Sequence, residues 1–253
     1  MQSIVCPMFI PTLCFALLHG YVLLDNVSIN GSGPYRFLVD TSSQSTSITP
    51  QLANALKLDP VYRVTLETSD GSKIVPASNV RIDVGSVQAE AVEVLWYDRP
   101  THDALDGPID GILGHNFLSR FDFVLDFKRR ALAFAPPSAF AELLSGERIP
   151  LRLNEGRPLI PARFSSGGKP IDFFLDFGPQ ALFLPPELAG HARRGSIKKV
   201  FIGDTEFANV PAMVHQTPLL SASLFDSIYM NSESGYAVIN PDLRFSSTCR
   251  GGL

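Results

Sequence analysis

Short apolar runs separated by turn residues dominate the pattern along this chain. Tyr21–Ile29 and Tyr35–Asp40 are two such runs, and Asn30-Gly31-Ser32-Gly33-Pro34 lies between them. β-Branched and aromatic runs around an Asn-Gly turn are typical of a β-hairpin. The same reasoning predicts further strands at Val61–Thr68, Lys73–Ala77, Val80–Val84, Ala91–Trp96, Phe121–Asp126 and Ala131–Phe134. The first half of the chain therefore reads as mostly β structure.

Helical patterns are few and short. Thr49-Pro50 precedes Gln51–Leu56, in which Leu52, Ala53 and Leu56 lie on one helical face. A second short helix is predicted for His115–Ser119, and we expect His115, as its first residue, to lie near the surface. Neither segment is long enough to form a helical layer.

The second half of the chain repeats the first. The windows Gly31–Ala53 and Gly167–Ala189 superpose without a gap at an offset of 136, with eight identical pairs. The later strand-like runs follow in the same order: Leu159–Phe164, Ile171–Asp176, Val200–Ile202, Val210–Val214, Ile228–Asn231 and Tyr236–Ile239. Only the hairpin Val61–Ala77 has no counterpart, which would fall between Leu188 and Val200. An internal duplication of β units is predicted.

This duplication divides the chain into three parts. Residues 1–20 form an apolar N-terminal segment, residues 21–137 a first lobe, and residues 150–245 a second lobe. The apolar run Ile4–Leu18 has the length of a signal-peptide core, although no Lys or Arg precedes Arg36. Export to the periplasm or outside the cell is slightly favoured, and the alternatives are a mis-assigned start or a first buried strand.

Two aspartates end matching strands of the repeat. Asp40 closes Phe37-Leu38-Val39-Asp40, and Asp176 closes Phe173-Phe174-Leu175-Asp176. A single aspartate after an apolar strand is usually a turn or cap residue. A pair at equivalent repeat positions can be brought together, and two adjacent carboxylates that share one proton can do acid–base chemistry.

The flanking residues resemble those of a known family. Asp40 is followed by Thr41-Ser42 and, roughly seventy residues later, by Ile112-Leu113-Gly114. Retropepsin-like and pepsin-like aspartic proteases have a hydrophobic-hydrophobic-Asp-Thr/Ser-Gly turn and then a hydrophobic-hydrophobic-Gly segment in a ψ-shaped loop. The similarity covers about Tyr21 to Phe134 well and Leu151 to Ile239 more faintly.

The resemblance implies a mostly β, two-lobed, acid-protease-like β-barrel architecture with short helices after each catalytic-type turn and ψ-loop. Asp40 and Asp176 would be the catalytic pair that activates a water for peptide hydrolysis. The supporting residues would be Thr41, Ser42, Gly178, Ile112, Leu113 and Gly114. A flap hairpin, Val61–Ala77, would cover the substrate with its tip near Asp70 and Gly71. No cofactor and no metal is implied.

Both lobes depart from the family pattern. Ser42 stands where the family has glycine, and adds a Cβ to a tight turn. In the second lobe Gly178 is present, but Phe177 replaces the residue whose hydroxyl bonds across to the other lobe. Ser221 takes the place of the second ψ-loop glycine. Of the two positions that carry a hydroxyl residue in the family, only the one at Thr41 is kept.

Composition limits the other classes of function. The net charge of −4, with no stripe of Lys and Arg, argues against nucleic-acid binding. The three cysteines show no disulfide framework and the five histidines no ligand spacing, so a metal site is not expected. No stable membrane span is predicted beyond the N-terminal apolar run.

Three hypotheses remain open from the sequence. The first is an aspartic endopeptidase that acts on peptide or protein substrates as a monomer with pseudo-two-fold lobes. The second is an inactive relative that binds a peptide or an envelope partner between its lobes, motivated by Ser42, Phe177 and Ser221. The third, a homodimer of the first lobe, is made less attractive by the duplication.

Overall fold

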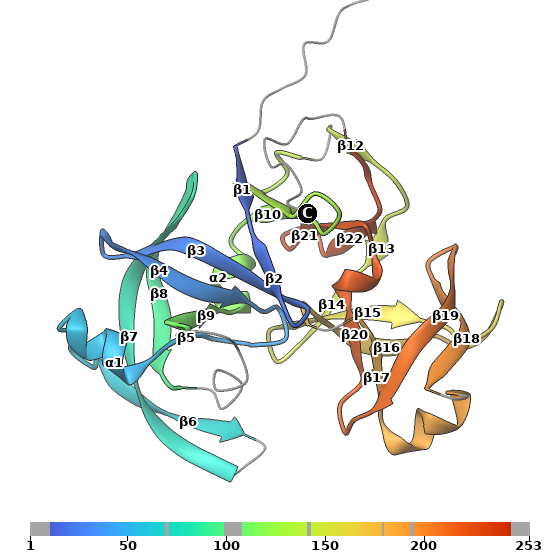
Figure 1. The fold of residues 1–253 in the computed structure, drawn as a ribbon, viewed down its shortest axis with the longest axis horizontal. Coiled ribbons are helices and arrows are strands. Elements are labelled where there is room, and N and C mark those ends of the chain that lie inside the picture. Colours follow the sequence, from blue (N-terminus) through green and yellow to red (C-terminus); the bar gives the residue numbers. More distant parts are fainter. Residues whose placement is uncertain are drawn as a thin grey trace, which may run out of the picture.

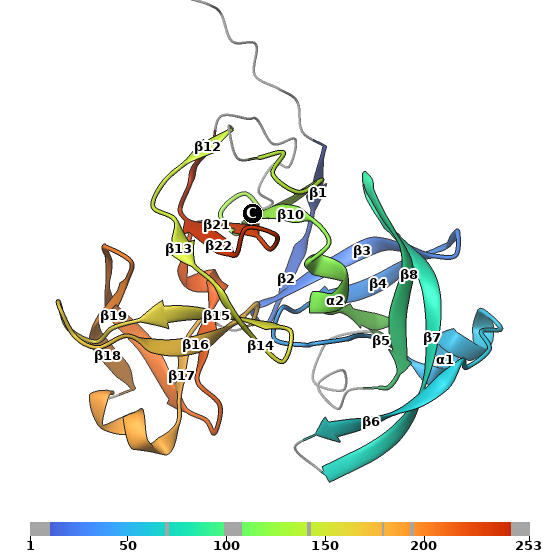
Figure 2. The ribbon, with the colours of Figure 1, turned by 180° about the vertical axis from the view of Figure 1, so that it is seen from behind.

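Two β lobes flank a sheet to which both contribute (Figures 1 and 2). The computed structural model describes residues 11–68, 71–98, 108–140, 143–178, 180–192 and 195–243. In these residues strands predominate and helices are short. The mostly β, two-lobed architecture predicted from the sequence is therefore confirmed.

The first lobe is an eight-stranded sheet in the order β2-β3-β4-β9-β5-β8-β7-β6. β3 also pairs with β7, which curls the sheet back on itself. The strands are β2 (Ala16–Leu18), β3 (Tyr21–Ile29), β4 (Ser32–Val39), β5 (Thr46–Ile48), β6 (Tyr62–Thr68), β7 (Gly71–Val84), β8 (Val87–Trp96) and β9 (Gly111–Leu113). The predicted strands Lys73–Ala77 and Val80–Val84 are thus parts of one long strand, β7.

The second lobe is a seven-stranded sheet in the order β14-β15-β16-β20-β17-β19-β18. A bridge between Arg163 and Phe201 brings its two ends together. The strands are β14 (Arg152–Asn154), β15 (Arg157–Ala162), β16 (Ile171–Asp176), β17 (Leu182–Leu184), β18 (Ser196–Ile202), β19 (Thr205–Val214) and β20 (Leu219–Ser221). This order repeats that of the first lobe strand for strand. Among the described residues no strand corresponds to β6.

A six-stranded sheet joins the lobes in the order β1-β11-β10-β21-β22-β13. Its strands are β1 (Thr12–Cys14), β10 (Asp122–Asp126), β11 (Ala131–Ala135), β13 (Ile149–Pro150), β21 (Ser227–Asn231) and β22 (Tyr236–Ile239). The hairpins β10–β11 and β21–β22 meet antiparallel, with Val124 opposite Tyr229. The duplication therefore extends through this shared sheet. A small ladder of β12 (Leu144–Ser145) and β23 (Asp242–Leu243) lies beside it.

A buried polar network crosses the centre of the shared sheet. Asp122 is fully buried, and its Oδ2 accepts hydrogen bonds from the Tyr229 hydroxyl at 2.5 Å and from the Ser138 N–H at 2.9 Å. Asn231 donates to the Tyr229 hydroxyl at 3.0 Å. Burial raises the pKa of the Asp122 carboxyl above its usual range. Groups from both lobes therefore share one polar core.

The short helices follow the aspartate turns and the ψ-loops, as the sequence predicted. They are α1 (Pro50–Ala55), α2 (His115–Leu118), and the 3-10 helices η2 (Pro186–His191) and η3 (Ala222–Leu224). The Thr49 side chain accepts the Leu52 N–H and caps α1. At the β3–β4 turn, Asn30 and Gly31 both have positive φ, as tight hairpins require.

Residues Thr12–Leu18, part of the predicted N-terminal segment, are built into both neighbouring sheets. β1 pairs with β11, β2 pairs with β3, and Phe15 between them is 5% exposed. Of these residues Phe15 is buried, whereas the residues of β1 and β2 are partly buried or exposed. Cys14 is disulfide-bonded, which the cysteine spacing did not indicate.

The described part of the chain contains no helix long and apolar enough to cross a membrane.

Candidate active site

Asp40 directly follows β4, at the point where this strand is held between two neighbours. β4 pairs antiparallel with β3 and parallel with β9, so that Leu38 lies opposite Ile112 and Val39 opposite Leu113. The Asp40 N–H then donates to the Leu113 carbonyl at 3.1 Å. Ile112 and Leu113 are buried. The ψ-loop segment expected from the sequence thus fixes the backbone of this aspartate.

Gly114 is required by the close approach of the backbone. A Cβ at this position would lie 2.4 Å from the Ser45 carbonyl carbon and 2.7 Å from the Thr46 nitrogen. These atoms belong to the backbone of the Asp40 loop and cannot move aside easily. The Gly114 N–H donates to the Thr46 hydroxyl at 3.1 Å. Gly114 therefore lets the ψ-loop pack directly on the loop that carries Asp40.

Hydroxyl groups of its own turn orient the Asp40 carboxylate. Oδ1 accepts the Ser42 N–H at 2.8 Å and the Ser42 hydroxyl at 2.7 Å, while Oδ2 accepts the Ser43 hydroxyl at 2.6 Å. Ser42 is not among the residues with positive φ, so the backbone here does not need glycine. The replacement of glycine by Ser42 therefore adds a donor to the carboxylate without backbone strain.

Asp176 is the last residue of β16 and occupies the equivalent place in the second lobe. β16 runs parallel to β20, and Asp176 lies opposite Ser221. Both aspartates are largely buried, with 8% of Asp40 and 9% of Asp176 exposed. A Cβ on Gly178 would lie 2.6 Å from Asp176 Oδ2 and 3.3 Å from the ring of Tyr21 in β3. Gly178 therefore leaves space for the carboxylate.

Ser221 supports the second turn from a position where the first lobe has glycine. Its hydroxyl is fully buried and donates to the Gly178 carbonyl at 2.8 Å. The Ser223 hydroxyl reaches the same carbonyl at 3.1 Å. Hydroxyl groups of the second ψ-loop thus bond to the backbone of the Asp176 turn.

A hydrogen bond from Thr41 joins the two turns across the lobes. The buried Thr41 hydroxyl donates to the Leu175 carbonyl at 2.7 Å. Thr41 follows Asp40, and Leu175 precedes Asp176, so this bond holds the backbones of the two aspartate turns side by side. The cross-lobe contact that the sequence allowed for Thr41 is present.

Phe177 makes a contact of a different kind. Its ring is 1% exposed and packs edge-to-face against Phe123 and Phe127, with ring centroids 6.1 and 6.5 Å apart. Phe123 belongs to β10 of the shared sheet and Phe127 follows it. Phe177 therefore contributes to the hydrophobic core between the lobes, where its apolar contacts replace the missing hydroxyl bond.

The hairpin β6–β7 is the counterpart of the expected flap. Its two strands pair in register, from Tyr62 opposite Ala77 at one end to Thr68 opposite Gly71 at the other. Gly71 has a φ of 107°, a conformation that favours glycine at a tight turn. Asp70, the other predicted tip residue, lies outside the described residues. Ile74 and Tyr62 are exposed on this hairpin.

The burial of His115 is a correction to the sequence-based expectation. This residue does begin α2, but only 5% of it is exposed, and burial lowers the pKa of its imidazole to about 4. Ser43 and Ser223 were also missed as site residues. Ser43 lies three residues after Asp40, at cap spacing, and this spacing could have identified it; nothing in the sequence pointed to Ser223.

Comparison with known proteins supports the first lobe's resemblance. The family model described as aspartyl protease matches residues 26–117, which include Asp40, the β6–β7 hairpin and Gly114. No curated protein matches the chain. The first lobe is therefore similar to aspartyl proteases, and the second lobe lies outside the matched region. The described residues contain no group of three or more His, Cys, Asp or Glu side chains that could hold a metal ion.

Proposed function

We propose that this protein is an aspartic endopeptidase whose catalytic pair is Asp40 and Asp176. The observation that carries this proposal is the Thr41–Leu175 hydrogen bond, because it joins the residues next to the two aspartates. The match of the first lobe to aspartyl proteases supports the same class of reaction.

The mechanism follows from the chemistry of two adjacent carboxylates. One of them, ionised, takes a proton from a water, which attacks the carbonyl carbon of the peptide bond. The other, protonated, donates a hydrogen bond to the carbonyl oxygen and stabilises the charge that develops there. The tetrahedral intermediate then collapses: the C–N bond breaks, and the first carboxyl group returns the proton it took from water to the leaving amine nitrogen. Ser42 and Ser43 would orient the Asp40 carboxylate through their hydroxyls. The β6–β7 hairpin would close over the substrate and exclude water.

Substitution of each aspartate tests the proposal. Asp40→Asn and Asp176→Asn should each abolish cleavage of a peptide library between acidic and neutral pH. A matched control is Asp172→Asn, in the same strand as Asp176 but paired with Arg152 at the surface. The control variant should keep full activity. A statine-type inhibitor should block that activity. A parent protein that cleaves nothing, or an active Asp40→Asn variant, would overturn the assignment.

The runner-up is a protein that binds a peptide or an envelope partner without cleaving it. Phe177 favours this reading, because it removes one of the two hydroxyls that brace such a pair in the resembled family. Calorimetric titration with a statine-containing peptide separates the two functions. Binding without turnover of any substrate would establish the binding function.

We further propose that the protein is an exported monomer. The disulfide at Cys14 supports an oxidising compartment. Because Thr12–Leu18 form strands, removal of a signal peptide would have to occur before Thr12. N-terminal sequencing of the mature protein tests the removal of a signal peptide. The mass of the protein in solution tests whether it is a monomer.

A further inference from the structure

The first hairpins of the two lobes, β2–β3 and β14–β15, have equivalent tight turns. His19 and Gly20 join β2 to β3, and Glu155 and Gly156 join β14 to β15. All four residues have positive φ, which is the geometry of a two-residue hairpin turn. The offset of 136 that relates the lobes also relates these turns. The two hairpins are therefore copies of one element.

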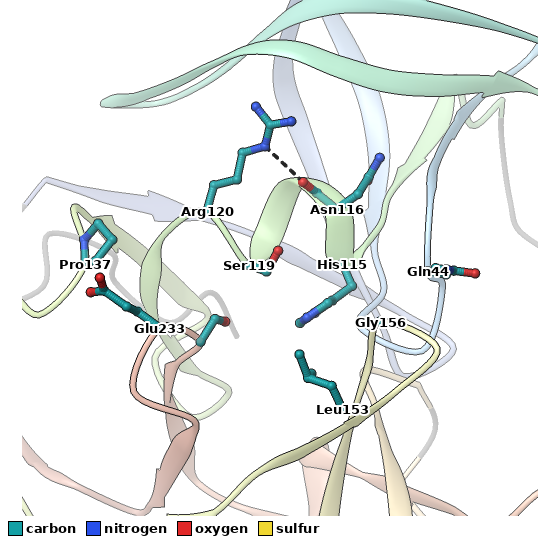
Figure 3. Close-up of a pocket in the computed structure, with 10 residues that line it drawn as sticks. Gln44, His115, Asn116, Ser119, Arg120, Pro137, Leu153, Gly156 and Glu233 are labelled. Atoms are coloured by element: carbon teal, nitrogen blue, oxygen red, sulfur yellow. Dashed lines mark hydrogen bonds between the residues drawn. The ribbon is translucent and has the colours of Figure 1, made fainter. Parts of the chain in front are cut away.

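Each of these hairpins reaches the aspartate loop of the other lobe. A Cβ on Gly156 would lie 3.4 Å from Cγ of Gln44, in the loop that follows Asp40. Figure 3 shows Gly156 beside the loop that carries Gln44, where both line a pocket. In the other direction, a Cβ on Gly178 would lie 3.3 Å from Cε1 of Tyr21, the first residue of β3. The lobes thus exchange contacts at both aspartate turns.

The side chains that leave the two hairpin turns differ. Tyr21 and Arg157 occupy equivalent positions at the offset of 136. The Arg157 guanidinium lies 4.0 Å from the centre of the Phe174 ring and pairs with Glu155 at 3.1 Å, so it is held by residues of its own lobe. Tyr21, in contrast, carries the edge of its ring to Gly178 in the second lobe.

The second aspartate turn lacks the hydroxyl side chains that orient the first aspartate. In the first turn, the hydroxyls of Ser42 and Ser43 donate to the carboxylate. The equivalent positions of the second turn are Gly178 and Pro179, neither of which carries a hydroxyl. A side-chain hydroxyl for Asp176 at this place therefore has to come from another part of the chain.

The Tyr21 ring borders the space that the absent side chain of Gly178 leaves beside Asp176. The same Cβ position that is 3.3 Å from Tyr21 Cε1 is 2.6 Å from Asp176 Oδ2. The tyrosine hydroxyl lies two bonds beyond Cε1, and a phenol can donate to a carboxylate. Because only 9% of Asp176 is exposed, water competes little with such a donor, and a hydrogen bond to a charged acceptor is a strong one.

We propose that Tyr21 is a positioning residue, whose hydroxyl donates to Asp176 and orients its carboxylate from the other lobe. Tyr21 does for the second aspartate what Ser42 and Ser43 do for Asp40, and all three hydroxyls belong to the first lobe. The inference rests on the proposed function, since the orientation of Asp176 affects turnover only if Asp176 is one of the catalytic pair.

Carbon NMR of the aspartate carboxyl groups tests the contact without any need for turnover. Asp176→Asn assigns the Asp176 resonance, and Tyr21→Phe removes a hydroxyl while keeping the ring. The Asp176 resonance should move in Tyr21→Phe. The matched control is Tyr35→Phe, which removes a hydroxyl from a partly buried tyrosine of β4 and should leave this resonance in place. A resonance that does not move in Tyr21→Phe would overturn the proposal.

Peptide cleavage gives the second measurement. Tyr21→Phe should lower kcat by about tenfold and leave KM unchanged, because a misaligned carboxylate affects the reaction step rather than binding. Tyr35→Phe should cleave like the parent. An unchanged kcat, or a raised KM at unchanged kcat, would overturn the positioning role. If the parent cleaves nothing and the Asp176 resonance still moves in Tyr21→Phe, the hydrogen bond is upheld and only the peptidase function is lost.

Discussion

The Asp40 turn and the Asp176 turn occupy equivalent places in their lobes, but different side chains hold them. In the first turn the hydroxyls of Ser42 and Ser43 bond to the carboxylate. In the second, the hydroxyls of Ser221 and Ser223 bond to a backbone carbonyl, that of Gly178. The strand pairings beneath the turns are the same. The duplicated backbone has therefore been kept while the polar groups that support it have been rearranged.

The contacts between the lobes show the same difference. Thr41 reaches the other lobe with a hydrogen bond, and Phe177, its counterpart, reaches it with an aromatic ring. A hydroxyl bond fixes a distance and a direction, whereas ring packing mainly contributes stability. The two turns are thus joined by a directional contact at Thr41 and by a hydrophobic contact at Phe177. The comparison can be tested at three pairs of positions.

The largest effect is expected at Gly114, whose counterpart is Ser221. Gly114→Ala would place a Cβ 2.4 Å from backbone atoms of the Asp40 loop. We expect the free energy of unfolding to fall by about 3 kcal/mol or more, as for severe overpacking. Ser221→Ala removes one hydroxyl and should cost about 1 kcal/mol. Urea denaturation measures both losses of unfolding free energy. Equal losses would show that the two ψ-loops are stabilised in the same way.

The second effect depends on pH and concerns His115, whose counterpart is Ala222. The pKa of folded His115 is lowered to about 4, so the unfolded chain binds more protons below its ordinary pKa of about 6.5. Stability is therefore full above pH 6.5 and is lost as the pH falls toward 4, by about 3 kcal/mol at pH 4. His115→Phe should lack this loss. The difference in unfolding free energy between parent and variant, followed from pH 7 to 4, checks it.

Charge changes elsewhere in the chain affect parent and variant alike and cancel in the difference. A difference that stays constant with pH would mean that His115 titrates as an exposed histidine does.

The sequence predicted the backbone of this protein better than its side-chain contacts. Matched patterns around Asp40 and Asp176 were sufficient to predict the strands and the equivalence of the two turns. β1 and β2 were ambiguous, because three-residue strands are too short to show a period of two. Their apolar residues fit a signal peptide equally well.

The missed contacts involve segments that are distant in the sequence. Leu153 and Ser232 line the same pocket as His115, and neither is near it along the chain. Likewise, Phe177 stands where the family motif has a hydroxyl residue. Only its packing against Phe123 shows what its ring contributes. A sequence motif shows which side-chain group is missing at a position. Which contact replaces it depends on the residues that the fold brings close.

The third effect concerns Phe177. Phe177→Thr restores the hydroxyl of the family pattern but removes a buried ring from Phe123 and Phe127. A lost phenylalanine ring costs about 3 to 5 kcal/mol, and a new hydrogen bond returns about 1 kcal/mol. We therefore expect a net loss of about 3 kcal/mol in urea denaturation. Phe177→Leu, which keeps most of the volume, should lose less. A Phe177→Thr variant as stable as the parent would show that the ring contributes little.

The smallest of these effects, and the most specific, is expected at Thr41. Thr41→Val keeps the shape of the side chain and leaves the buried Leu175 carbonyl without its donor, which should cost about 2 kcal/mol. Thr41→Ser keeps the hydroxyl and should cost less than half as much. Phe177 cannot make the reciprocal bond, and among the described residues of the two turns no second hydroxyl is seen to take the place of Thr41. Turnover should therefore fall further in Thr41→Val than its loss of stability alone accounts for, whereas Thr41→Ser should stay near the parent. If the two variants match in both stability and turnover, the hydroxyl bond does not align the aspartates.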